Sequence, residues 1–82
     1  MAGEKYLGLT NYLVQKGNSD FKMSFDEVKR VNNDYLPASA YKYAEWWSNN
    51  TIGHTHAFGW LNAGYETHDV SIANGEVWFK RV

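Results

Sequence analysis

The stretch from Leu36 to Asn50 holds two adjacent tryptophans, Trp46 and Trp47, close to two tyrosines. A small domain rarely commits that much aromatic area to one segment unless the segment builds a compact core or a contact surface. Neighbouring residues on a helix or a strand point in different directions, so Trp46 and Trp47 cannot both face one core. We therefore expect one of them to pack inside and the other to lie at an edge that a partner can reach.

The length and composition favour one small domain that spans residues 1–82. Such a chain has a marginal core, which its four tryptophans and 17% aromatic residues would fill. It has no cysteine, which excludes a disulfide framework and a thiolate metal site and suits a cytoplasmic location. Because the sequence has neither a signal peptide nor an apolar run long enough to span a membrane, we expect a cytoplasmic protein without membrane attachment.

The first half of the chain predicts two helices with a short strand between them. Apolar residues at three- and four-residue steps indicate a helix over 4–16, which Gly17 ends. Residues 20–23 have the alternation of a short strand. Ser24 and Glu27 then have the spacing of a capping box, which starts a second helix running from about Phe25 to Asn32.

Two further helices are predicted in the aromatic middle of the chain. Pro37 is a favourable first residue, and the spacing of the apolar residues after it predicts a helix over 37–47. The same periodicity predicts a helix over 54–63, which Gly64 ends.

The last 18 residues are typical of a β-hairpin. Asn74-Gly75 is the preferred two-residue turn, flanked here by strands over 65–72 and 76–82. Counting outward from that turn gives two faces. The expected core face pairs Ile72 with Val77, Val70 with Phe79, and His68 with Arg81. The other face pairs Ser71 with Trp78 and Asp69 with Lys80, so Trp78 is expected to point away from the core.

The predicted order of elements is helix, strand, three helices and two strands. This indicates an α+β fold, a small winged-helix-like domain with a short strand and a C-terminal β-hairpin. The chain has one helical segment more than a winged helix. This extra segment lies before the expected recognition helix over 54–63.

Several motifs together resemble an uncharacterised prokaryotic family, a domain of unknown function found alone and in mobile-element contexts. The resemblance rests on Leu36-Pro37-x-Ser39-Ala40, Trp46-Trp47-Ser48-Asn49, Trp60-x-x-x-Gly64 and Val77-x-Phe79-x-Arg81, and it extends from Tyr6 to Arg81. It implies a small α+β domain and brings no activity with it. The family often has a basic residue directly after the alanine of the first motif, where this chain has Tyr41 followed by Lys42.

No pattern in the sequence predicts catalysis, a metal or another cofactor. His54 and His56 are two residues apart and do not converge on a helix, and no carboxylate cluster accompanies His68. Ser39, His54 and Asp69 have the residue types of a hydrolase triad, but no glycine-bracketed serine supports one. We therefore expect a protein that is not an enzyme.

Binding is the expected function, with DNA recognition through a winged-helix-like surface as the leading expectation and a protein partner as the alternative. In the first, the 54–63 helix presents Thr55, His56 and Asn62 to DNA while the hairpin presents Trp78 and Lys80; the net charge of −1 argues against strong affinity. In the second, a small phage or mobile-element domain inhibits a host defence enzyme through aromatic anchors. The candidate contact residues are Lys42, Trp46, Asn49, Thr55, His56, Asn62, Trp78, Lys80 and Arg81. For Arg81, a structural bond to backbone carbonyls competes with a role as an anion clamp.

Overall fold

The computed structural model describes residues 4–82 and has an α+β architecture. Its three strands form an antiparallel sheet in the order β1-β3-β2. The elements in chain order are the 3₁₀ helix η1 (Glu4–Tyr6), α1 (Leu7–Lys16), β1 (Phe21–Ser24), α2 (Phe25–Val31), α3 (Ala38–Lys42), the 3₁₀ helices η2 (Ala44–Trp47) and η3 (Thr55–Ala57), α4 (Phe58–Leu61), β2 (Tyr65–Ser71) and β3 (Glu76–Arg81).

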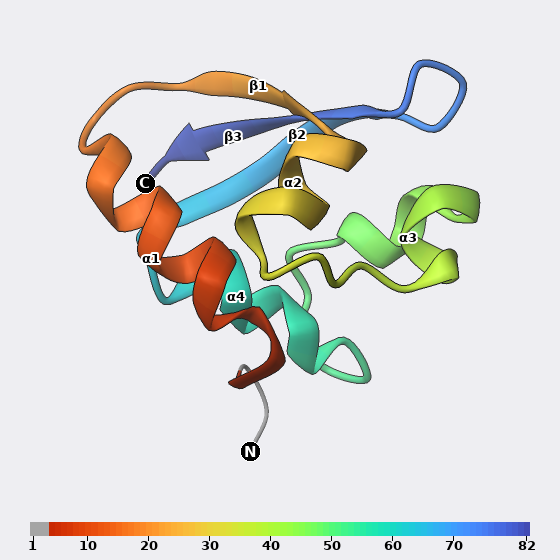
Figure 1. Cartoon of the computed structure of the whole chain (residues 1–82), viewed down its shortest axis with the longest axis horizontal. Coiled ribbons are helices and arrows are strands. Elements are labelled where there is room, and N and C mark those ends of the chain that lie inside the picture. The colour runs from red at the N-terminus through yellow and green to blue at the C-terminus, as the bar shows by residue number, and fades with distance from the viewer. Residues whose placement is uncertain (1–3) are drawn as a thin grey trace.

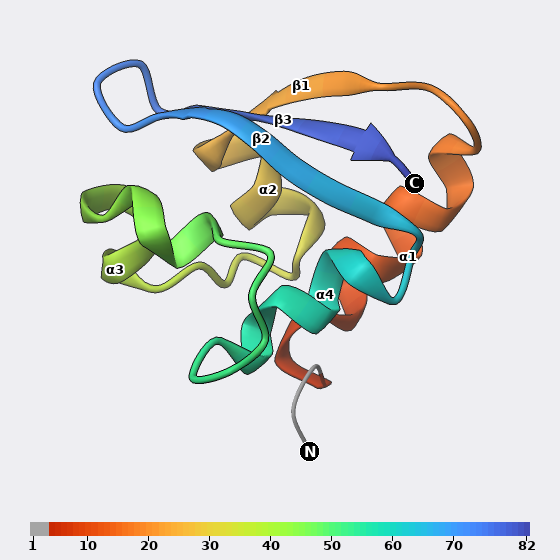
Figure 2. The same cartoon turned by 180° about the vertical axis from the view of Figure 1, so that it is seen from behind.

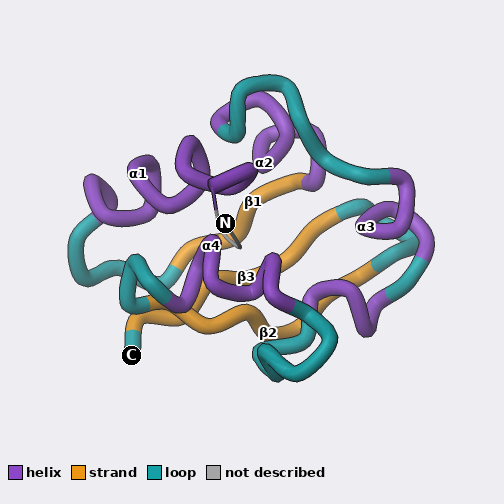
Figure 3. The backbone as a smooth tube through the Cα atoms, turned by 90° about the horizontal axis from the view of Figure 1, so that it is seen from below, coloured by secondary structure: helices purple, strands orange, loops and turns teal. Residues whose placement is uncertain are grey.

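The molecule has two layers, with the sheet on one side and the helices on the other (Figure 1). The view from behind shows the same separation (Figure 2). Seen from the helical side, α1 lies beside α2 and α4, and the strands run behind them (Figure 3). The helices of the described chain cover only one face of the sheet, and within residues 4–82 no element covers the opposite face of the three strands.

The first half of the chain folds as its sequence predicts. A helix ends at Lys16, and Gly17 follows it with a left-handed φ of 78°. The capping box is also confirmed, because Ser24 Oγ accepts from the Glu27 amide at 3.0 Å and the Glu27 carboxylate accepts from the Ser24 amide at 2.8 Å. These two bonds fix the point at which β1 turns into α2.

The core between the layers is largely aromatic, and one polar side chain is completely buried in it. Asn32 has no exposed surface. Its Oδ1 accepts from the Leu9 amide at 3.1 Å, and its Nδ2 donates to the carbonyls of Lys5 and Tyr35 at 3.1 and 2.9 Å. With every polar atom bonded, this amide ties the end of α2 to the start of α1.

The continuous helix expected over 37–47 is wrong. α3 ends at Lys42, and Tyr43 has an extended backbone with φ −124° and ψ 117° before η2 begins. The side chain of Trp47 folds back, and its Nε1 donates to the Ala40 carbonyl at 2.9 Å. In a continuous helix that carbonyl would bond the amide of Ala44, so the indole of Trp47 replaces a backbone donor.

The expectation that one of the two adjacent tryptophans lies at an edge is also wrong, since Trp46 and Trp47 are only 8% and 2% exposed. Their rings do point in different directions, with 74° between their planes. Trp47 stacks on Phe25 at 4.9 Å inside the core. Trp46 points the other way, where the imidazole of His56 covers one of its faces at 4.1 Å and 5°.

The helix expected over 54–63 is shorter and begins differently. A 3₁₀ turn, η3, precedes a four-residue α4 in which Gly59 and Trp60 are buried. Gly59 lies against α1 and its approach: a Cβ on it would stand 2.7 Å from that of Tyr6. Thr10 Oγ1 donates to the Gly59 carbonyl at 2.6 Å. This segment is therefore held closely against the first helix.

The hairpin forms, but its expected register is wrong. The turn spans residues 72–75, and among its residues only Gly75 has a positive φ, 65°. Asp69, at φ 48°, lies in an irregular stretch between His68 and Ser71 that shifts the pairing. The partners across β2 and β3 are Tyr65 with Arg81, Glu66 with Lys80, Thr67 with Phe79, His68 with Trp78, and Ser71 with Glu76.

Two consequences follow for the faces of the sheet. Val77 and Phe79 are buried as expected, and Val70 and Ile72 pack partly against the core. Trp78 points away from the core as expected. His68 lies beside it on the open face, because the shifted register places Tyr65, not His68, opposite Arg81.

Candidate functional site

The open face of the sheet presents a row of three side chains, one from each strand. Lys22 of β1 and His68 of β2 both lie directly opposite Trp78 of the central strand. The rings of His68 and Trp78 are 5.9 Å apart and inclined by 30°. Trp78 is 36% exposed, which makes it the most accessible of the four tryptophans. We call Lys22, Trp78 and His68 the sheet row.

Positive and negative groups alternate around the sheet row. Lys22 Nζ lies 3.5 Å from a carboxylate oxygen of Glu76, and His68 Nδ1 lies 3.0 Å from a carboxylate oxygen of Asp69. Lys80 is opposite Glu66 in the strand pairing. Each cationic or titratable basic group on this face thus has an acidic neighbour, so the face has no excess of positive charge.

The candidate contact residues of the 54–63 segment do not form one surface. Thr55 and Asn62 are exposed, but His56 is half-buried and engaged: it stacks on Trp46, and its Nε2 lies 2.6 Å from the Trp46 carbonyl. Burial lowers the pKa of His56 below its ordinary 6.5, partly opposed by the bond to the Trp46 carbonyl. Near pH 7 the imidazole is therefore neutral, and Nε2–H donates to that carbonyl.

Asn49 and Arg81 use their side chains for bonds within the chain. Asn49 Oδ1 accepts from Trp60 Nε1, the Thr67 amide and Thr67 Oγ1 at 2.9, 2.9 and 3.0 Å, while Nδ2 donates to the Thr67 carbonyl at 3.0 Å. Arg81 donates from Nη1 to the Gly64 carbonyl at 2.6 Å and lies over the Tyr65 ring. Of the two roles expected for Arg81, the structure shows the structural bond to a backbone carbonyl.

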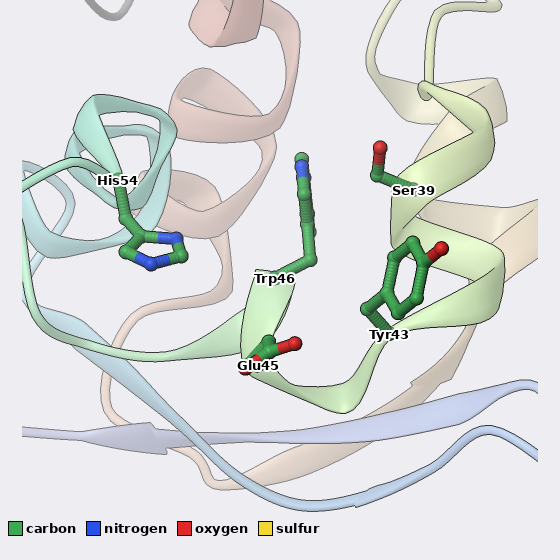
Figure 4. Close-up of a pocket in the computed structure, with 5 residues that line it drawn as sticks. All are labelled: Ser39, Tyr43, Glu45, Trp46 and His54. Atoms are coloured by element: carbon green, nitrogen blue, oxygen red, sulfur yellow. The ribbon is translucent and has the colours of Figure 1, made fainter.

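A pocket of about 280 Å³ opens on the helical side of the molecule, between α3, η2 and the start of η3. Its lining residues are Ser39, Tyr43, Glu45, Trp46 and His54. Figure 4 shows the indole of Trp46 standing between His54 on one side and Ser39 and Tyr43 on the other. Lys42, another candidate contact residue, is exposed at the end of α3, one residue before Tyr43.

The arrangement of polar groups gives little basis for a hydrolytic site. Ser39 and His54 line the same pocket, but Trp46 stands between them in Figure 4. Asp69 lies on β2, where its carboxylate bonds His68. Among residues 4–82, no three His, Cys, Asp or Glu side chains are grouped so that they could hold a metal ion. The groups exposed on these surfaces are aromatic rings, such as those of Trp78 and Tyr43, and single charged side chains.

The candidate contact residues from the sequence did not include six residues of these surfaces: Lys22, Ser39, Tyr43, Glu45, His54 and His68. Lys22 had a readable signal, because it alternates with Phe21 and Met23 in the strand and must face away from the core. Tyr43 and Glu45 had none, since a helix over 37–47 puts them on the surface without a pocket. Only the break at Tyr43 brings their side chains to one opening.

The comparisons with known proteins agree with the resemblance that the motifs carry. A family model described as Domain of unknown function (DUF7662) matches residues 6–82. No curated protein and no solved structure matches the chain. None of the helices that the structure describes is long and apolar enough to cross a membrane. With nearly its whole length matched, the chain belongs to the family Domain of unknown function (DUF7662).

Proposed function

We propose that this domain is a non-catalytic binding module for another protein, and that the sheet row is the centre of its contact surface. The observation that supports this best is an accessible tryptophan on a sheet face that none of the helices described within residues 4–82 covers. Tryptophan is the residue type most enriched among energetic anchors of protein interfaces, and such anchors lie near the centre of the contact.

The charges around Trp78 favour a protein over a nucleic acid. A surface that binds phosphates needs cations free to replace counterions. Here Lys22 has Glu76 at 3.5 Å, and Lys80 is paired across the strands with Glu66. A mixed rim of this kind around an aromatic centre is typical of protein interfaces. The cytoplasm is the compartment that we propose, in keeping with a chain without cysteine.

DNA recognition by a winged-helix-like surface is the second candidate. The β1-β3-β2 order of the sheet favours it, as does an order of elements that differs from that of a winged helix by one extra helical segment. Against it, α4 has only four residues, two of them buried, so it offers little to a major groove. Fold-level similarity alone is weak support for function.

In-cell photo-crosslinking tests the protein-binding proposal. A benzoylphenylalanine at Lys22 places the crosslinker in the sheet row, and one at Lys29, exposed on α2, is the matched control. We expect a nuclease-resistant crosslinked protein from position 22 and none from position 29. Equal capture from both positions contradicts the proposal.

The captured protein is then purified and titrated against the domain. We expect Trp78→Ala to weaken binding roughly 30-fold or more, as loss of an interface anchor does. The free energy of unfolding should change by less than about 1 kcal/mol, because Trp78 is a surface residue. Added salt should change the affinity little.

Duplex DNA is titrated in parallel at two salt concentrations. Binding that falls steeply with salt, and that weakens further in Lys80→Glu, favours the nucleic-acid candidate and overturns the proposal.

A further inference from the structure

The pocket on the helical side has a rigid aromatic wall. Trp46 is held by His56 against one face, by Trp47 at 4.8 Å and 74°, and by Tyr6 at 5.9 Å. Its remaining exposure of 8% borders the pocket. The imidazole of His56 covers one face of the ring, and Tyr43 and Ser39 lie on the side of the indole away from His54 (Figure 4). The indole is thus held in place, and its small exposed part can contact a ligand without first ordering itself.

The wall of the pocket opposite Trp46 is accessible, and the charge that the pocket carries is negative. Tyr43 is 54% exposed and stands across the opening from Trp46. Glu45 supplies a carboxylate at the base of the same opening (Figure 4), and the lining contains no lysine or arginine. An aromatic slot with one carboxylate attracts cations through both the ring faces and the charge.

We propose that this pocket binds the guanidinium group of an arginine side chain from another protein, packed between the ring of Tyr43 and the exposed part of the Trp46 indole and paired with the carboxylate of Glu45. A guanidinium is planar, stacks on aromatic rings and pairs with both oxygens of a carboxylate, whereas a lysine ammonium is a compact and strongly hydrated point charge. A nucleotide brings a phosphate, which Glu45 repels. The pocket lies on the helical side, so this site is separate from the sheet row and is testable without it.

A short peptide and NMR spectroscopy of the isotope-labelled domain test the proposal. The probe is acetyl-Gly-Arg-Gly-amide. The matched control peptide carries citrulline, which keeps the shape and hydrogen-bond donors of arginine but has no charge. We expect shifts of the Trp46 indole signal and of the Ser39 and Tyr43 amides, and affinity roughly tenfold higher for arginine than for citrulline, as expected for a cation on an aromatic face beside a carboxylate.

Variants separate the two walls of the pocket. Glu45→Gln should weaken arginine binding about fivefold by removing the charge, while Glu66→Gln, which removes an acidic group from the sheet, should leave it unchanged. Tyr43→Ala should also weaken it, and the same spectra report whether the variants stay folded. Trp78→Ala should have no effect, so failure of the protein-binding proposal and failure of this one give different results.

Three outcomes overturn the arginine site. The first is equal binding of the arginine and citrulline peptides, and the second is unchanged binding by Glu45→Gln. The third is stronger binding of guanosine monophosphate than of the arginine peptide at the same signals, which would identify a nucleotide site instead.

Discussion

His56 makes two different contacts with Trp46. Its ring covers one face of Trp46, and its Nε2 donates to the carbonyl of the same residue. Burial of the ring disfavours the protonated imidazole, and the bond to the Trp46 carbonyl opposes this effect only in part. The lowered pKa of His56 therefore links the geometry around Trp46 to pH.

That link gives a prediction for stability against pH. The pKa of His56 in the folded chain is below its ordinary value of 6.5, so the unfolded chain binds more protons between the two pKa values. The stabilisation is complete above the unfolded pKa and decreases as pH falls from about 6.5 toward the folded pKa. Urea unfolding at pH 8, 7, 6 and 5 should show this loss.

His56→Phe is the matched variant, because it keeps a ring against Trp46 and removes the titration. Its unfolding free energy should fall less between pH 7 and pH 5 than that of the parent chain. Identical pH slopes for the two proteins would show that His56 titrates alike in the folded and unfolded states.

At the scale of elements, the most local signals of the sequence were the most reliable. The capping box at Ser24 needs only residues three positions apart, and it predicted the start of α2 correctly. The break at Tyr43 depends on the indole of Trp47 reaching Ala40, a contact that apolar spacing does not encode. The end of α3 is therefore set by packing between residues that are not neighbours along the chain, which the periodicity of apolar residues does not predict.

The hairpin register illustrates the same limit. Asn74-Gly75 predicted a two-residue turn. The preferred form of that turn requires a positive φ at both of its residues, whereas in this turn only Gly75 has one. The Gly75 carbonyl accepts from the Phe25 amide at 2.7 Å, which ties the turn to the start of α2. The candidate site inherited the error, because the correct register is what places His68 beside Trp78.

The capping box makes the prediction at this scale. Ser24→Ala removes the acceptor for the Glu27 amide and should lower the free energy of unfolding by about 1 kcal/mol. Ser39→Ala is the comparison, since the Ser39 side chain is exposed and caps no helix in the described chain. Equal stability of Ser24→Ala and the parent in urea melts would contradict a stabilising cap.

At the scale of the whole molecule, Asn49 joins three parts of the fold. Its amide meets the indole of Trp60 in α4 and both backbone groups of Thr67 at the outer edge of β2, while its own backbone follows η2. An unpaired strand edge is a template for association with other chains. The side chain of Asn49 occupies that edge as a neighbouring strand would.

Asn49→Ala should therefore have two effects. Removing these bonds leaves buried donors without partners and should cost about 3 kcal/mol in the free energy of unfolding, and the freed edge of β2 should increase self-association. Urea unfolding and sedimentation velocity measure the two. Asn62→Ala, at an exposed position, is the control. A loss no larger than that of the control would rule out a joining role for Asn49.

The unequal exposure of the tryptophans gives the protein two separate optical reporters. Trp46, Trp47 and Trp60 lie within 4.8 to 5.9 Å of one another, close enough for coupled near-ultraviolet circular dichroism that follows the core. Trp78 lies apart from them on the solvent side, so red-edge emission and acrylamide quenching belong mainly to it. Comparing the parent with Trp78→Phe separates the signals, and unlabelled protein then reports folding and occupancy of the open face in one cuvette.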